Sequence, residues 1–386
     1  MIPQFEFGTA SRIVFGNGVL EQAGTLAKGL GTCALIVTGR DQRRAKRLQE
    51  ILNKSGVASS LLGVAGEPDL KAVEQGVAAA KKSGCDLIIS YGGGSAIDAG
   101  KAIAAMLANP GELTDYLEII GRGKSLTKGS APFIAIPTTA GTGSEVTRNA
   151  VLASPEHRVK VSLRSPLMLP RIALVDPELT YDLPPAITAS TGLDALTQLI
   201  EPFVCARANP MTDALCVEGM GRAARSLLVA FRNGPEKAAR EDMALASLFG
   251  GLALANAGLG AVHGFAGPLG GMFQAPHGAV CAALLPHVME MNIGALRKRE
   301  PQNPALARYA RVASLLTGNE RATAEDGAAW VQRLVKNLQV PRLRSYGIQR
   351  QDADELVEKA AKSSSMKANP ITLSHDELRT VFESVL

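Results

Sequence analysis

Residues 86–102 read DLIISYGGGSAIDAGKA, a strand, a run of glycines and a helix, and this order decides the fold. The apolar segment before the glycines is typical of a buried strand, and the segment from about Ser95 is typical of a helix. Gly92, Gly93 and Gly94 would let the backbone approach a ligand, and the N–H groups at the helix start favour a phosphate. The alternative is that these glycines bind no ligand and only form a tight turn between the strand and the helix. The spacing matches neither the GxxxxGK[ST] loop nor the GxGxxG fingerprint. It therefore indicates a nucleotide or phosphate ligand but does not identify which one.

The segments around this motif alternate in the same way between strand and helix. Apolar runs predict strands at 34–38, 59–64, 133–137 and 172–175, and helical spacing is seen over 41–56 and 69–84. This alternation favours a parallel sheet with helices on both faces. Beyond residue 180 the chain is rich in alanine and leucine at helical period. We therefore predict an α/β domain over residues 1–180 and an all-helical domain over residues 181–386.

Two further loops extend the expected ligand site. Residues 136–147, IPTTAGTGSEVT, follow a predicted strand, and their hydroxyls (Thr138, Thr139, Ser144) could close over the same ligand. Residues 37–48, VTGRDQRRAKRL, end another strand at Gly39 and continue with Arg40 and further basic residues. Arginine beside an adenosine pocket favours a 2′-phosphorylated cofactor. The alternatives are a solvent-exposed connecting loop for the first segment and a solvent-exposed helix face for the second.

Histidine is rare in this chain, with five in 386 residues, so the pair His263 and His277 is informative. His277 follows Pro276 at an expected loop-to-helix junction. Asp194 and Gln198 stand four apart in a helical segment and so share one face. An Asp with two His is a plausible divalent metal site, although Gln is an unusual fourth ligand. The residues alone leave a metal site and a proton-transfer site both open.

Composition narrows the class of protein. A net charge of +5 with scattered basic residues gives no indication of nucleic acid or a membrane surface as partner. The five cysteines form no CxxC pair, which argues against disulfides and a zinc-thiolate site. The chain starts without a secretory pattern and has no run of about eighteen apolar residues. We expect a cytoplasmic protein that acts on small molecules.

Taken in order, GGGSAIDAGKA, IPTTAGTGSEVT, VKVSLRSPLMLP, DPELT, GLDALT and HGFAGPLGGMFQAPHG resemble the iron-containing (group III) alcohol dehydrogenase family over nearly the whole chain. The resemblance implies a dinucleotide-binding α/β domain, a helical metal and substrate domain, and a cleft in which a nicotinamide faces an alcohol. The cofactor positions implied are Gly93, Gly94, Ser95, Asp98, Thr138, Thr139, Ser144, Lys160 and Leu179. An acidic residue at position 39 is associated with NAD in the family. Gly39 followed by Arg40 therefore favours NADP(H) as the cofactor.

The resemblance also implies a metal site, with two departures. The family holds iron or zinc with an Asp, a His four residues later on the same helix, and two later histidines. Asp194, His263 and His277 match, whereas Gln198 replaces the helix histidine and is expected to weaken binding. A further histidine of the substrate pocket is replaced by Gly267.

The leading hypothesis is reversible hydride transfer between NAD(P)(H) and an alcohol, aldehyde or ketone. Asp194, Gln198, His263 and His277 would hold the divalent metal, and without a metal His263 or His277 would act as the general acid. One alternative is a lyase resembling dehydroquinate synthase, which the mostly apolar helical motifs disfavour. The other is a nucleotide-binding homologue with weak catalysis. The family usually forms at least dimers, and residues 5–16, FEFGTASRIVFG, could supply an intersubunit strand.

Overall fold

The computed structural model of this chain describes residues 4–386, which fall into two compact units. The sheet unit comprises Gly8–Thr139 and Gly143–Thr180. The helical unit comprises Tyr181–Leu386 together with Ala140–Thr142 and the described residues before Gly8. The tip of the 136–147 loop thus groups with the helices, although the rest of that loop belongs to the sheet unit.

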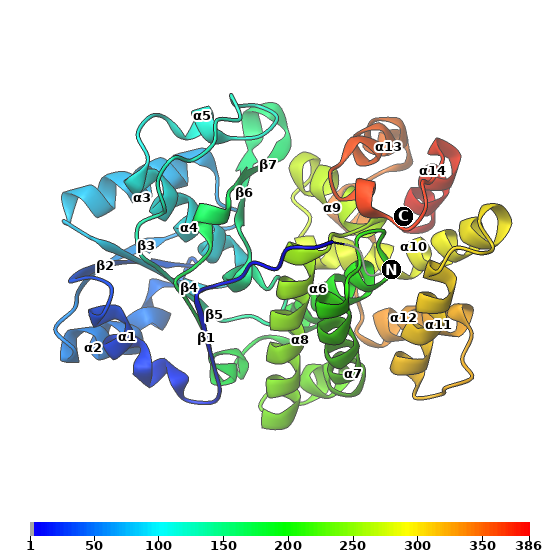
Figure 1. The fold of residues 1–386 in the computed structure, drawn as a ribbon, viewed down its shortest axis with the longest axis horizontal. Coiled ribbons are helices and arrows are strands. Elements are labelled where there is room, and N and C mark those ends of the chain that lie inside the picture. Colours follow the sequence, from blue (N-terminus) through cyan, green and yellow to red (C-terminus); the bar gives the residue numbers. More distant parts are fainter. Residues whose placement is uncertain (1–3) are drawn as a thin grey trace. The chain divides into compact units, whose positions relative to one another are not determined.

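A six-stranded parallel sheet forms the centre of the sheet unit (Figure 1), in the order β1-β8-β5-β4-β2-β3. Its strands are β1 (Arg12–Phe15), β2 (Cys33–Thr38), β3 (Ala58–Gly63), β4 (Leu87–Gly92), β5 (Phe133–Pro137) and β8 (Ile172–Val175). Its helices are α1 (Ala23–Lys28), α2 (Lys46–Lys54), α3 (Leu70–Lys82), α4 (Gly94–Ala108) and α5 (Leu113–Tyr116). The predicted parallel α/β fold is confirmed.

The strands are apolar on both sides because helices cover both faces of the sheet. Along β2, Leu35 and Val37 pack with residues of α3 and α4, whereas Ala34 and Ile36 pack with residues of α1 and α2. This alternation follows from the two-residue period of a strand. It explains why β2 reads as a continuous apolar run rather than as an alternating one.

The strand order places the glycine loops where a ligand site is expected. The chain runs from β2 outward to β3 and then returns to the other side of β2 as β4. The order of the strands therefore reverses between β2 and β4, and ligands bind beyond the carboxyl ends of strands at such a switch point. Gly39 follows β2 and Gly93 follows β4 at this edge.

An antiparallel hairpin was missed by the sequence interpretation. Strands β6 (Asn149–Ser154) and β7 (Val159–Arg164) form a separate two-stranded sheet. Buried and half-buried residues alternate along β6. The six residues of β7, VKVSLR, alternate apolar and polar side chains and lack the continuous apolar runs from which the central strands were predicted.

Nine helices make up the helical unit in the described part of the chain (Figure 1). They are α6 (Pro185–Val204), α7 (Pro210–Arg232), α8 (Lys237–Asn256), α9 (Ala261–Met272), α10 (His277–Arg299), α11 (Ala305–Thr317), α12 (Ala324–Asn337), α13 (Ala353–Lys362) and α14 (His375–Ser384). Their apolar faces share one continuous core. The prediction that this half is all-helical is confirmed for the described residues.

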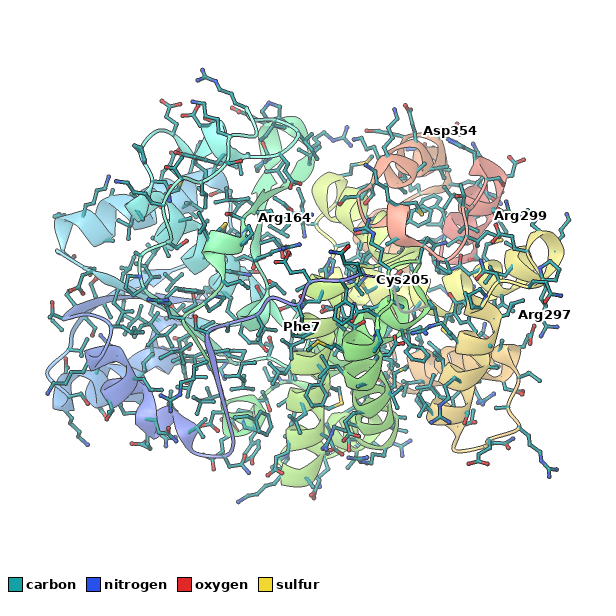
Figure 2. All side chains as sticks on the ribbon, in the orientation of Figure 1. Phe7, Arg164, Cys205, Arg297, Arg299 and Asp354 are labelled. Carbon is teal, nitrogen blue, oxygen red and sulfur yellow. The ribbon has the colours of Figure 1, made fainter. Side chains whose placement is uncertain are left out.

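Helix α10 is long and apolar enough to be a candidate membrane span by length and composition. However, 72% of its most apolar window is buried inside the structure, as expected of a core helix. Its last turn is basic, which suits the negative end of the helix dipole. Arg297 and Arg299 project from this end (Figure 2) and pair with Glu325 and Glu377.

Two glycines predict opposite stability effects. A Cβ at Gly192 of α6 would lie 2.2 Å from Leu227 Cδ1, whereas a Cβ at the exposed Gly294 of α10 would meet no atom within 4 Å. We expect Gly192→Ala to lower the free energy of unfolding by about 1–3 kcal/mol through overpacking. Gly294→Ala should raise it by about 0.5–1 kcal/mol because alanine is the better helix former. Urea unfolding measures both, and changes of the same sign would contradict the packing described.

Candidate active site

The two glycine-containing loops of the sheet unit lie side by side. Helix α4 begins at Gly94 with Gly93 as its N-cap, so the free N–H groups of its first turn stand at the carboxyl edge of the sheet. The backbone N–H of Thr138 donates to the carbonyl of Gly92 at 2.9 Å. A Cβ at Gly93 would approach Thr139 Oγ1 to 3.3 Å. The predicted phosphate loop and the hydroxyl loop therefore border one surface.

Asp98 links α4 to the loop and hairpin that follow β5. Its carboxylate accepts a hydrogen bond from the Ser144 hydroxyl and another, 3.0 Å long, from the backbone N–H of Val151. Lys101 is fully buried, lies 3.2 Å from the same carboxylate and donates to the Thr147 hydroxyl. The sequence reasoning missed Lys101, although it lies three residues after Asp98 on the same helix face. These contacts hold the loop after β5, which is predicted to bind the cofactor, against α4.

The remaining predicted cofactor residues lie in different surroundings. Lys160 is on β7, and its ammonium group pairs with the Glu67 carboxylate at 3.1 Å. Leu179 packs against the core under α1 and α2. Gly39 and Arg40 follow β2, and the space beside Gly39 is open. Their roles in cofactor binding remain predictions.

Glu145 predicts a pH dependence of stability. Its complete burial raises its pKa from 4.5 to about 7, against the opposing influence of a backbone hydrogen bond and of Lys101. The folded protein thus keeps a proton that the unfolded chain loses near pH 4.5, and stability falls as pH rises from that value through about 7. Glu145→Gln should remove this loss and stabilise the protein by about 3 kcal/mol at pH 8.

Unfolding free energies of the wild type and Glu145→Gln across pH 4–8 would measure this effect. The exposed Glu156 provides the control variant Glu156→Gln, which should follow the wild-type profile. Parallel profiles for wild type and Glu145→Gln would show that Glu145 ionises normally in the fold.

In the helical unit, three helices bring a compact set of donor atoms together. Asp194 comes from the middle of α6, His263 from the first turn of α9, and His277 is the first residue of α10. Asp194 Oδ1 lies 3.6 Å from His263 Nε2 and 3.7 Å from His277 Nε2. Cys281, one turn after His277, completes a set whose donor atoms all lie within 4.8 Å of one another.

Glu201 positions His263. Its Oε2 lies 2.6 Å from His263 Nδ1, and its Oε1 accepts the backbone N–H of Val262 at 2.7 Å. Glu201 therefore binds the start of α9 and the ring of His263 at once. When Nδ1–H of His263 donates to Glu201, Nε2 is the ring nitrogen that faces Asp194 and Cys281.

The charges of this cluster shift its pKa values in opposite directions. Burial disfavours the imidazolium of His263, but Cys281, Asp194 and Glu201 outweigh burial and raise the pKa of His263 well above its ordinary value. Burial also raises the pKa of the Cys281 thiol, yet the charges of His277 and His263 dominate and the pKa is lowered. Strongly perturbed groups of opposite sign in one cluster are typical of a functional site.

Comparison with known proteins identifies the family of this chain. The family model described as "Iron-containing alcohol dehydrogenase" matches residues 10–177, and its C-terminal counterpart matches residues 188–386. Alcohol dehydrogenase 4 of Schizosaccharomyces pombe is 37% identical over 391 residues, covering 100% of this chain and 90% of the relative. The 1,3-propanediol dehydrogenase of Klebsiella pneumoniae is 35% identical and covers 95% of each chain.

The chain belongs to the iron-containing alcohol dehydrogenase family. Among solved structures, that of a 1,3-propanediol oxidoreductase covers 100% of both chains with a TM-score of 0.91 and 34% identity. Membership identifies the protein as an alcohol dehydrogenase that uses a nicotinamide cofactor and a divalent metal. The dehydroquinate synthase-like and non-catalytic alternatives are not favoured.

The donor set fits the metal that this family implies. Asp194 is 1% exposed, yet its Oδ1 has no hydrogen-bond partner among the described residues, and neither has Oε1 of the buried Gln198. Leaving a buried carboxylate oxygen unpaired is costly, so the Asp194 carboxylate is suited to bind a cation. Carboxylate, imidazole and thiolate are all ligands of divalent transition metals. Asp194, His263 and His277 could hold the ion.

Three residues refine the sequence interpretation. Cys281 was grouped with the apolar cysteines, although its i+4 spacing from His277 was a visible signal. Glu201 was missed, although it lies seven residues after Asp194 on the same face of α6. Gly267 is half-buried, and a Cβ there would meet no atom within 4 Å, so the position of the family histidine is open.

Proposed function

We propose that this family member transfers a hydride between NAD(P)(H) and a small uncharged alcohol or carbonyl compound, with the substrate oxygen at the cluster of Asp194, His263 and His277. The observation that carries this proposal is the orphaned Asp194 Oδ1, which faces two ring nitrogens at 3.6 and 3.7 Å. A divalent metal held there would polarise the substrate oxygen and stabilise developing alkoxide charge.

The chain's own residues prepare this site before substrate arrives. Glu201 fixes the tautomer and orientation of His263, and Gln198 lies one turn after Asp194 on α6. His277 is 31% exposed, whereas Asp194 and His263 are buried, so the site is open on the His277 side. Substrate would approach from there, and the protein groups would stay fixed during the reaction.

For the cofactor, we propose that the loops after β4 and β5 bind the dinucleotide and that NADP(H) is preferred. Arg43 pairs with Asp41 and Arg47 with Glu21, whereas Arg40 is exposed and makes no ion pair among the described residues. Arg40 is thus available to bind a 2′-phosphate beside the open Gly39.

Arg40→Ala tests this cofactor preference. A charge-assisted contact is worth about 1.5–3 kcal/mol, so KM for NADPH should rise about 10–100-fold while KM for NADH stays nearly constant. Steady-state kinetics with both cofactors provide the measurement, and Arg43→Ala is the matched control. An equal change for both cofactors, or a wild type that prefers NADH, would overturn the NADP(H) proposal.

For the substrate, we propose a short-chain alcohol, diol or the corresponding aldehyde. The region of α9 around the open Gly267 carries small residues, and the K. pneumoniae relative is named for 1,3-propanediol. Cofactor reduction or oxidation with a panel of alcohols, diols and aldehydes tests the proposed function. Tight cofactor binding without turnover of any member of the panel would contradict it.

We also propose a cytoplasmic enzyme that forms a homodimer or higher homo-oligomer. All five cysteines are free thiols, which suits a reducing compartment. Strand β1 lies at one edge of the sheet and pairs only with β8 among the described residues, so its other edge is available to a second copy. Light scattering during gel filtration measures the mass, and a monomer would contradict the assembly.

A further inference from the structure

The sulfur of Cys281 sits within the cluster that faces the orphaned carboxylate oxygen. Cys281 is fully buried, and its Sγ lies 3.6 Å from His277 Nε2 and 3.9 Å from His263 Nε2. Because His277 and Cys281 are four residues apart on α10, both side chains project from one face of that helix. The sulfur therefore points to the same place as both imidazoles and Asp194.

Four of the separations between the donor atoms lie near the edge lengths of a metal tetrahedron. Around zinc, with bonds of about 2.0–2.1 Å to nitrogen or oxygen and about 2.3 Å to sulfur, tetrahedral ligands stand about 3.4–3.6 Å apart. The measured separations are 3.6 and 3.7 Å from Asp194 to the two histidines and 3.6 and 3.9 Å from the sulfur to them. The two separations that involve Asp194 are too long for hydrogen bonds between nitrogen and oxygen.

Charge balance favours the same arrangement. Asp194 is buried, and a dication beside it needs more negative charge than one carboxylate supplies. A thiolate at Cys281 would add a second negatively charged ligand to Asp194, whereas the neutral amide of Gln198 would not. The Glu201 carboxylate contacts the His263 ring and would not touch the ion itself.

We propose that Cys281, as a thiolate, is the fourth metal ligand in place of Gln198. The site is then Asp–His–His–Cys, a donor set that favours zinc or cobalt over iron because thiolate is a soft ligand. The inference rests on the proposed function only in taking this cluster as the metal site. It differs from the expectation that Gln198 would be the fourth ligand.

Spectroscopy of the metal-loaded full-length protein tests this ligand set without requiring turnover. Cobalt-loaded wild type should show a thiolate-to-cobalt charge-transfer band together with the intense visible bands of tetrahedral cobalt. X-ray absorption of the zinc form should show one sulfur at about 2.3 Å beside nitrogen and oxygen neighbours at about 2.0–2.1 Å. Cys281→Ser should abolish the sulfur signals, whereas Cys33→Ser, with a half-buried thiol in the sheet unit, should retain them.

Zinc affinity gives a second readout. Cys281→Ser should weaken zinc binding by more than the about 10–100-fold that follows loss of a residue which only orients a ligand, whereas Gln198→Ala should stay within that range. Bound cobalt without a charge-transfer band, or wild type that binds neither ion, would overturn the inference. Because the wild-type spectra suffice, misfolding of a variant does not block the test. Sulfur ligation without dehydrogenase activity would uphold this inference and refute the proposed function.

Discussion

Asp194→Asn is expected to lower kcat/KM for alcohol oxidation by about 10³-fold or more. The substitution keeps the shape of the side chain but removes the buried charge that faces His263 and His277. Loss of metal-assisted charge stabilisation costs several kcal/mol, and about 4 kcal/mol corresponds to 10³-fold. Steady-state kinetics on metal-saturated protein, with metal content measured in parallel, give the result.

A matched control for this variant lies close by in the sequence. Asp182 is exposed and precedes α6, so Asp182→Asn should retain wild-type kinetics. If Asp194→Asn kept more than about a tenth of wild-type activity, a difference of only about 1.4 kcal/mol, Asp194 would not hold a catalytic metal.

Glu201→Gln is expected to weaken metal binding by about 10–100-fold and to lower activity at limiting metal. Carboxylates that accept the second ring N–H of a metal-binding histidine typically contribute this much. Glu201 stands 2.6 Å from His263 Nδ1, and a neutral amide would hold the ring less firmly. Competition with a chromophoric chelator measures the affinity.

This variant separates a positioning role from a purely structural one. Excess zinc should restore most of the activity of Glu201→Gln, because the ligands themselves are unchanged. Glu320→Gln, at an exposed turn, should bind metal like the wild type. Unchanged metal affinity in Glu201→Gln would mean that the contact with His263 serves only the packing of α9 on α6.

The sequence predicted the fold well where a physical signal is local and strong. Continuous apolar runs marked β2, β4 and β5 because helices cover both faces of a parallel sheet. The β6–β7 hairpin was missed because β7 alternates apolar and polar side chains instead of forming a continuous apolar run. The alternation in VKVSLR of β7 was a local signal that could have predicted a strand.

The candidate site was predicted in part for the same reason. The rarity of histidine and the spacing of Asp194 in its helix indicated Asp194, His263 and His277 as site residues. The structure brings their donor atoms within 4.8 Å of one another. The roles of Cys281 and Glu201 depend on how α6, α9 and α10 cross, which sequence spacing does not determine. A buried cysteine is far more often a core residue than a ligand, so only the fold could distinguish the two.

Metal analysis coupled to activity tests the central claim most directly. Protein purified without chelator should contain a divalent metal and oxidise alcohols with NAD(P). Chelation should remove metal and activity together, and added zinc should restore both. A metal-free protein that retains full activity would contradict the account and leave His263 or His277 as the proton donor.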